Sequence, residues 1–160
     1  MIIAIDANLQ KGIKLLRTIN NQVYCNKTIA PYYASIGTHI RHSLDVFTCI
    51  FKGVEDRNID FSFRDRNIQV EEDIKKGLRY FGDVQRNLQK IKGKDLNQIV
   101  FVNDDLGIEK VVVQHTLGSV LLQAHNHVIH HYASIGYIMF QLGVDLTSEN
   151  FGYNPTTPKK

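Results

Sequence analysis

Cysteines are scarce in this sequence, and dense runs of basic residues are missing. Its two cysteines, Cys25 and Cys49, are too few for a disulfide framework. The opening residues MIIAIDANLQ lack the basic segment and the longer apolar run of a secretory signal peptide. The 19 basic and 16 acidic residues include no basic run interleaved with aromatics, so nucleic acid is not an expected partner. We therefore expect a reducing, cytoplasmic setting.

Several catalytic motifs are also missing. The sequence has no H-E-x-x-H, which excludes the common zinc metalloproteases. It has no E-x-x-H, which argues against a carboxylate-bridged di-iron bundle. A phosphate-cradling glycine loop and a G-x-S-x-G elbow are absent as well. The remaining chemical signal comes from histidine.

Charged Asp, Glu, Lys and Arg side chains are absent from residues 111–144. The apolar stretch at 117–142 is interrupted at its centre by His, Asn and Gln, which lipid would penalise, so we exclude a membrane span. A helix here would be buried nearly all round and would carry several imidazoles into that interior. Buried polar groups need partners. We therefore expect a soluble protein whose clustered histidines share one role.

A metal ion is the role that these histidines suggest. His127 and His131 stand one helical turn apart on the same face and can both reach one ion. A third ligand comes from residues 35–52, where His42 lies in the middle of the inward row and is preferred, with His39 as the alternative. Three neutral histidines would leave a position open for water, as in catalytic sites. Zinc, nickel and iron all accept such ligands.

Other polar residues near these segments are weaker candidates. Asp45, one turn after the preferred ligand, can orient that ligand or take a substrate proton. His130 is a candidate for the wall of the site, and Cys49 is interpreted as a small core hydrophobe. Arg64 and Arg66 can clamp an anionic substrate, although ordinary surface pairing with nearby acidic residues is favoured. No catalytic residue is assigned.

Apolar residues recur at three- and four-residue steps in four segments, which predicts four helices. Two β-branched runs around Asn103, Asp104 and Gly107 predict a hairpin, and the charged connector at 55–67 is interpreted as a loop. The tail at 145–160 is expected to be extended and to pack through Phe151 and Tyr153. The predicted helices span residues 6–25, 35–52, 68–92 and 116–142, and the predicted strands span 99–102 and 110–113.

These elements together predict an all-α fold, namely a four-helix bundle with a small β-hairpin before the last long helix. A chain of 160 residues is of the usual size for one domain. No second-domain linker or internal repeat is recognisable. We therefore expect residues 1–160 to form a single domain.

Four segments of the chain resemble the DinB/YfiT-like superfamily of metal-binding four-helix bundles. In that family one histidine on the second helix and an H-x-x-x-H pair on a later helix hold a divalent metal. The resemblance thus implies His42, His127 and His131 as ligands. The segments are SIGTHIRHSLDVF (35–47), FSFRDRN (61–67), HNHVIHHYASIGYIM (125–139) and FGYNPTTP (151–158).

The resemblance also implies classes of activity. Some relatives are thiol-dependent S-transferases or isomerases that use low-molecular-weight thiols, and others look like metal-dependent hydrolases. The leading hypothesis is a metal-dependent enzyme, an S-transferase or a hydrolase, that acts on a small-molecule substrate. The alternative is a non-catalytic metal- or small-ligand-binding bundle, related to stress. Family members are often homodimers, so the resemblance allows a homodimer here.

Overall fold

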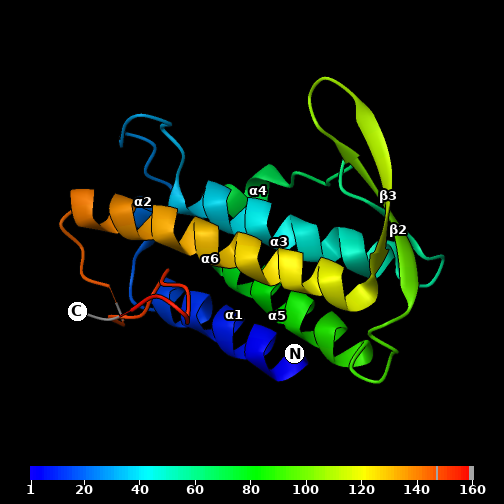
Figure 1. Ribbon diagram of the computed structural model, residues 1–160. Helices are drawn as coiled ribbons and strands as arrows, with labels where there is room; N and C mark the ends of the chain where they lie inside the picture. The colour runs from blue at the N-terminus through cyan, green and yellow to red at the C-terminus, as the bar shows by residue number, and fades with distance from the viewer. Residues whose placement is uncertain (147, 159–160) are drawn as a thin grey trace.

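Four long helices lie side by side in the computed structural model, which describes residues 1–146 and 148–158 (Figure 1). Helix α3 packs against both α5 and α6, and α1 packs against the same two helices. Buried apolar side chains from all four form one core cluster together with those of the strands. The long helices are α1 (Ile2–Leu16), α3 (Ile36–Gly53), α5 (Ile74–Lys90) and α6 (Leu117–Gln141).

The predicted all-α four-helix bundle is wrong. The described residues form six helices and a three-stranded mixed sheet, because α2 (Asn21–Tyr24), α4 (Ile68–Glu72) and a third strand are also present. Strand β1 (Asn58–Asp60) lies in the charged connector and pairs in parallel with β2 (Ile99–Asp105), with Ile59 opposite Val102. The sequence did not predict β1 because three residues are too few to show the alternation of a strand, and because the partner strand is distant in the chain.

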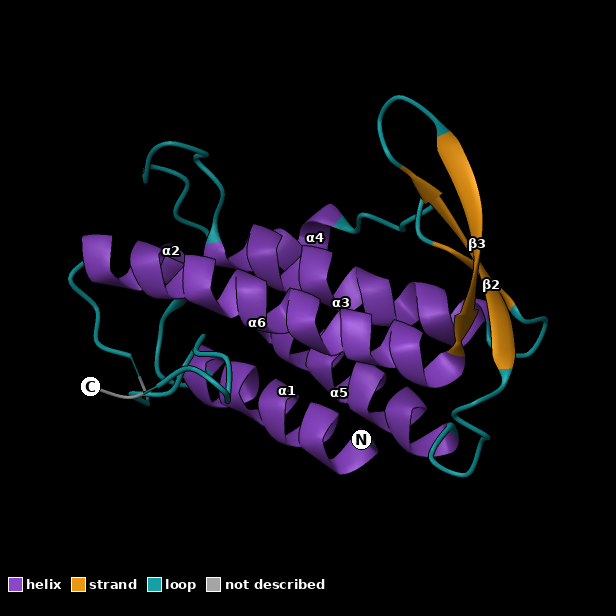
Figure 2. Ribbon diagram, viewed as in Figure 1, coloured by secondary structure: helices purple, strands orange, loops and turns teal. Residues whose placement is uncertain are grey.

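The predicted hairpin is confirmed and is longer than expected. Strand β2 pairs antiparallel with β3 (Lys110–Thr116), from Ile99 opposite Thr116 to Asp105 opposite Lys110. Val100 and Val102 are buried and anchor the hairpin to the helices. Figure 2 shows the two strands rising from one end of the helices. The hairpin therefore stands clear of the core over much of its length.

Two of the four predicted helices are each divided by a capping residue. The predicted helix at 6–25 is α1 followed by α2, because the Asn20 side chain accepts a hydrogen bond from the Val23 N–H and starts a new helix. The predicted helix at 68–92 is α4 followed by α5, because Asp73 is extended and caps α5 by accepting from the Lys75 N–H. Short polar side chains compete locally with the helix pattern.

The two helices that carry most of the histidines, α3 and α6, agree with the helices predicted from the sequence. Ser35 caps α3, since its hydroxyl accepts a hydrogen bond from the Thr38 N–H. Thr116 caps α6 in a capping box with Ser119. None of the helices within residues 1–146 and 148–158 is long and apolar enough to cross a membrane.

The described part of the tail forms turns rather than an extended segment. Phe151 is buried and its ring stacks on Tyr132 of α6 with centroids 4.6 Å apart, which confirms its predicted packing. Tyr153 is 58% exposed, so its predicted packing is wrong. The predictions for residues 147, 159 and 160 lie outside the described residues.

Candidate metal centre

The histidines predicted as ligands meet between α3 and α6. His42 of α3 faces His127 and His131 of α6, and one potential ligand atom of each lies within 4.8 Å of the other two. The ring centroids of His127 and His131 are 4.5 Å apart, and that of His42 is 4.8 Å from that of His131. His42, His127 and His131 can therefore hold one metal ion.

The spacing of the α6 pair fits a shared ion. His127 Nε2 lies 3.1 Å from His131 Nε2. Two nitrogens bound to one tetrahedral zinc ion at about 2.0–2.1 Å are about 3.3 Å apart. The donor set also fits, because three imidazoles form a common ligand group for a divalent transition metal.

His39, the alternative ligand, has a different place. It lies outside the three-histidine group, and its Nδ1 is 2.8 Å from the Nδ1 of His131. His131 thus directs Nε2 toward His127 and Nδ1 toward His39. The preference for His42 over His39 agrees with this geometry, and His39 becomes a hydrogen-bond partner of a ligand.

Burial sets the protonation of the cluster. Burial is the largest cause, and together with the positive charges of Arg64 and Arg41 it lowers the pKa of His42 to about 4. Burial and the neighbouring groups together lower the pKa of His127 to about 4 and that of His131 to about 2. These rings are neutral near pH 7, which is the state that a metal ion requires of histidine.

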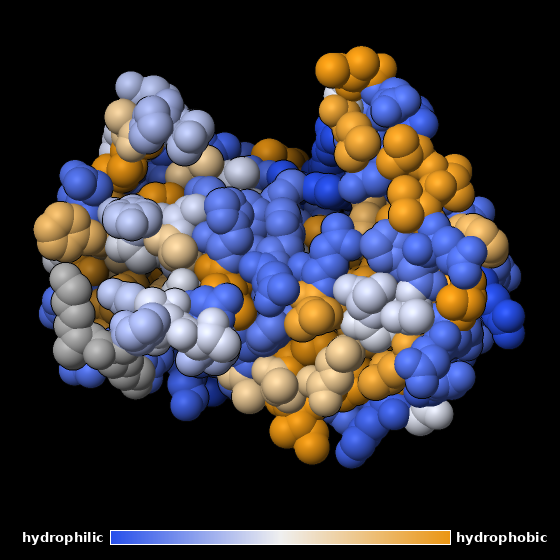
Figure 3. Space-filling model, in the orientation of Figure 1, coloured by the Kyte–Doolittle hydropathy of each residue, from blue (hydrophilic) through white to orange (hydrophobic). Residues whose placement is uncertain are grey.

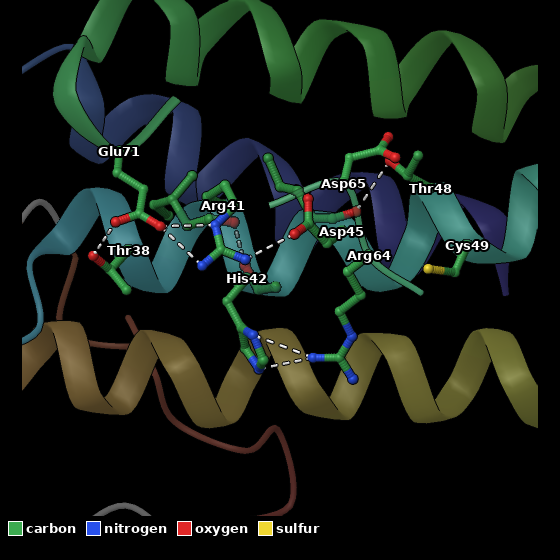
Figure 4. A network of polar contacts seen from close by, with 12 residues as sticks. Thr38, Arg41, His42, Asp45, Thr48, Cys49, Arg64, Asp65 and Glu71 are labelled. Carbon is green, nitrogen blue, oxygen red and sulfur yellow. Dashed lines mark hydrogen bonds and ion pairs between the residues drawn. The ribbon is translucent and has the colours of Figure 1, made fainter. Parts of the chain in front are cut away.

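Arg64 lies at the site. The sequence favoured ordinary surface pairing for this residue, and that prediction is wrong. Arg64 lies in the connector between β1 and α4. Its Nη1 is 3.2 Å from His42 Nδ1 and 3.4 Å from His42 Nε2 (Figure 4). Its Nε donates a hydrogen bond to the Phe61 carbonyl. The signal available in the sequence was the FSFRDRN segment, which gives no indication of where the arginine points.

Asp45 takes no part in the histidine cluster. Figure 4 shows the His42 ring pointing toward α6, whereas the Asp45 carboxylate meets the Arg41 guanidinium away from that helix. The Asp45 carboxylate accepts hydrogen bonds from Arg41 Nη1 at 2.8 Å and from the Tyr80 hydroxyl at 2.8 Å. Its predicted role beside the ligands is therefore not supported, because its oxygens are already engaged elsewhere.

Two remaining candidates, Cys49 and His130, lie outside the ligand group. Cys49 is buried, and burial raises the pKa of its thiol to about 11, which agrees with a small core hydrophobe. His130 is exposed, with its ring 5.2 Å from that of His131, and it lies outside the ligand group.

A groove of about 530 Å³ lies beside the cluster on the His39 side. One wall is the loop between α2 and α3, the other is the C-terminal half of α6, and His39 lies in the lining. In Figure 3 this loop and the hairpin stand above the rest of the molecule on either side of a notch in its outline. The apolar lining residues include Ile29, Pro31, Tyr137 and Ile138.

The cluster as a whole can hold a cation with three neutral nitrogens, next to one arginine and one further histidine. No protein-family model matches the chain, and no curated protein sequence matches it either. The geometry of the site and its charges are therefore the basis for inferring what it does.

Proposed function

We propose that this protein is a metal-dependent enzyme in which His42, His127 and His131 hold one divalent transition metal ion. The observation that carries the proposal is the group of three imidazole nitrogens within 4.8 Å of one another, which no carboxylate or thiolate of the described residues joins. A tetrahedral ion with three protein ligands keeps one position for a water or a substrate.

Zinc, nickel and iron are the three candidates for the ion. Imidazole ligands accept all three metals, so metal selection depends on geometry and availability. The 3.1 Å between the Nε2 atoms of His127 and His131 does not choose among them, because it lies between the roughly 3.0 Å of neighbouring ligands on an octahedral ion and the roughly 3.3 Å of those on a tetrahedral one. Metal analysis of the purified protein distinguishes the three directly.

The proposed reaction is either S-transfer with a low-molecular-weight thiol or hydrolysis of a small molecule. A bound divalent ion supplies Lewis-acid chemistry, since it lowers the pKa of a coordinated water or thiol toward neutrality. The chain contributes neutral ligands, orients His131 through His39, and places a groove next to the cluster. The resemblance of four segments to the DinB/YfiT-like family supports the same ligand set, and a homodimer stays a prediction.

A non-catalytic metal-binding protein is the second candidate. The observation that favours it is that the ligands come from two helices and are at least half-buried, with His131 only 9% exposed. An ion in this position would clamp α3 to α6. Removing a structural ion costs several kcal/mol of folding free energy, whereas an ion with a purely catalytic role leaves the fold largely intact.

Metal content tests the proposal. Protein purified without an affinity tag should contain or take up about one equivalent of a transition metal, and less than about a tenth of an equivalent after reconstitution would contradict it. His42→Ala, His127→Ala and His131→Ala should each lose the metal. His130→Ala is the matched control, because His130 neighbours the ligands but lies outside their group, and it should keep the metal.

Cobalt-substituted protein separates the two reaction classes. If the enzyme transfers a thiol, glutathione should change the visible spectrum of the bound cobalt at concentrations near those found in cells. A hydrolase leaves that spectrum unchanged or binds the thiol only as a weak inhibitor. Urea unfolding of the loaded and the metal-stripped protein then measures how much the ion contributes to stability.

A further inference from the structure

Arg64 is a cation without an anionic partner. Its side chain is half-buried, and it forms no ion pair with any carboxylate in the described part of the chain. Arg41, one residue before His42, provides the contrast, because it pairs with Asp45 at 2.8 Å and with Glu71 at 2.9 Å. The charge of Arg41 is therefore balanced by carboxylates, whereas the charge of Arg64 is not.

Positive charge lies next to the ligands on the Arg64 side. Arg64 Nη1 is 3.2 Å from His42 Nδ1, and no Asp or Glu side chain belongs to the three-histidine group. A divalent ion held by three neutral imidazoles would add two further positive charges, which no protein carboxylate of the ligand group offsets.

Arg64 Nη1 has an acceptor only while His42 is free of metal. A neutral imidazole offers one lone pair, because its other nitrogen carries a proton. Once that lone pair is given to an ion, neither His42 nitrogen can accept from Nη1, which lies 3.2 Å and 3.4 Å from them. The guanidinium then faces the site with only its Nε bonded, to the Phe61 carbonyl.

We propose that Arg64 binds an anionic group of the substrate, a carboxylate, and holds it next to the ion carried by His42, His127 and His131. The proposal rests on the proposed function, since it names the substrate class of the same site. A guanidinium presents its N–H groups in a planar fork that matches a carboxylate in two parallel hydrogen bonds. Carboxylate binding gives Nη1 a new acceptor and neutralises the excess charge.

The test measures acetate binding to the cobalt-loaded protein, both by the cobalt spectrum and by calorimetry. Arg64→Gln should weaken acetate binding by about tenfold or more, as expected for a lost hydrogen bond between charged groups. Arg64→Lys keeps the charge without the fork and should fall in between. Arg66→Gln is the matched control, because it removes one positive charge from the same connector, and it should change acetate affinity by less than about threefold. Metal content, measured on every variant, reports that the site is still folded.

The outcomes separate the two proposals. If Arg64→Gln holds metal and binds acetate as tightly as the wild type, the Arg64 inference is overturned and the metal enzyme stands. If inorganic phosphate binds in an Arg64-dependent way and acetate does not bind, the carboxylate assignment is overturned. If the protein holds no metal, the proposed function fails. The placement of the carboxylate next to an ion then fails as well, and carboxylate binding by Arg64 survives only if acetate binds the metal-free protein and that binding is lost in Arg64→Gln.

Discussion

The Nδ1 atom of His39 lies 2.8 Å from the Nδ1 atom of His131, and the two imidazole rings are 5.1 Å apart between centroids. The other nitrogen of His131 faces His127 at 3.1 Å. When Nε2 is the ligand atom, the proton of His131 is on Nδ1, and Nδ1 donates it to His39. Hydrogen bonds of this kind fix the tautomer and the ring orientation of histidine ligands.

We predict that the His39 side chain strengthens metal binding by accepting the hydrogen bond from His131, although His39 is not itself a ligand. His39→Leu removes the acceptor and should weaken metal affinity by about 10–100-fold, as other partners of histidine ligands do. His39→Asn keeps an oxygen near the position of Nδ1 and should retain most of the affinity. Competition with a chelator measures both variants. Equal losses in the two variants would mean that the hydrogen bond is unimportant.

The metal-free protein should lose stability as the pH falls from about 6.5 to about 4. The unfolded histidines take up protons near their usual pKa of 6.5, whereas His42 and His127 in the folded protein do so only near 4. The unfolded state therefore binds more protons within this window, and its free energy is lowered relative to the folded state. Above the window both states are neutral and stability is constant.

Urea unfolding of the chelator-treated protein at about pH 7.5 and about pH 5 measures this effect, which we expect to be on the order of 1 kcal/mol for each half-buried ring. His127→Gln should reduce the difference between the two conditions, because it removes one of the groups that titrate. A His127→Gln variant with the full pH dependence of the wild type would show that the effect arises elsewhere in the chain.

Sequence periodicity identified the helices that carry the ligands. It did not identify a short strand whose pairing partner is distant in the chain. Apolar spacing located α3 and α6. The breaks at Asn20 and Asp73 were missed, because a side-chain cap in the middle of an apolar pattern leaves that pattern unchanged. The three-residue β1 was missed because its pairing with β2 is decided by tertiary contacts.

The same limit applies to the candidate site. His127 and His131 could be paired from their spacing alone, because residues four apart share a helix face. His42 could be preferred to His39 from its place in the inward row. Arg64 could not be assigned, because a connector has no period that tells where a side chain points. Asp45 was misassigned for a related reason, since its position in α3 does not reveal that Arg41 and Tyr80 donate hydrogen bonds to its carboxylate.

The buried ion pairs of Arg41 yield a stability prediction. Its guanidinium bridges Asp45 within α3 and Glu71 of α4, and all three side chains are nearly inaccessible to solvent. Glu71→Ala leaves the buried arginine with one carboxylate fewer and should destabilise the protein by about 3–5 kcal/mol. Asp65→Ala, which breaks an exposed pair with Lys52, is the control and should change stability by less than about 1 kcal/mol. Urea unfolding of the two variants compares them, and similar values would contradict the prediction.

Two glycines in long helices should respond to alanine in opposite directions. A Cβ on Gly12 of α1 would collide with the Tyr132 hydroxyl and the Phe81 ring, whereas a Cβ on Gly82 of α5 would meet only the Arg86 side chain, at 3.5 Å. Alanine is the better helix former by about 1 kcal/mol, so Gly82→Ala should stabilise the protein by up to that amount. Gly12→Ala should instead destabilise it by about 1–3 kcal/mol, because overpacking outweighs propensity. Adding Tyr132→Phe to Gly12→Ala removes one of the colliding atoms and should restore part of the loss in urea unfolding. A Gly12→Ala variant as stable as the wild type would show that α1 and α6 can move apart at this point, and the close packing next to His131 would then not constrain the site.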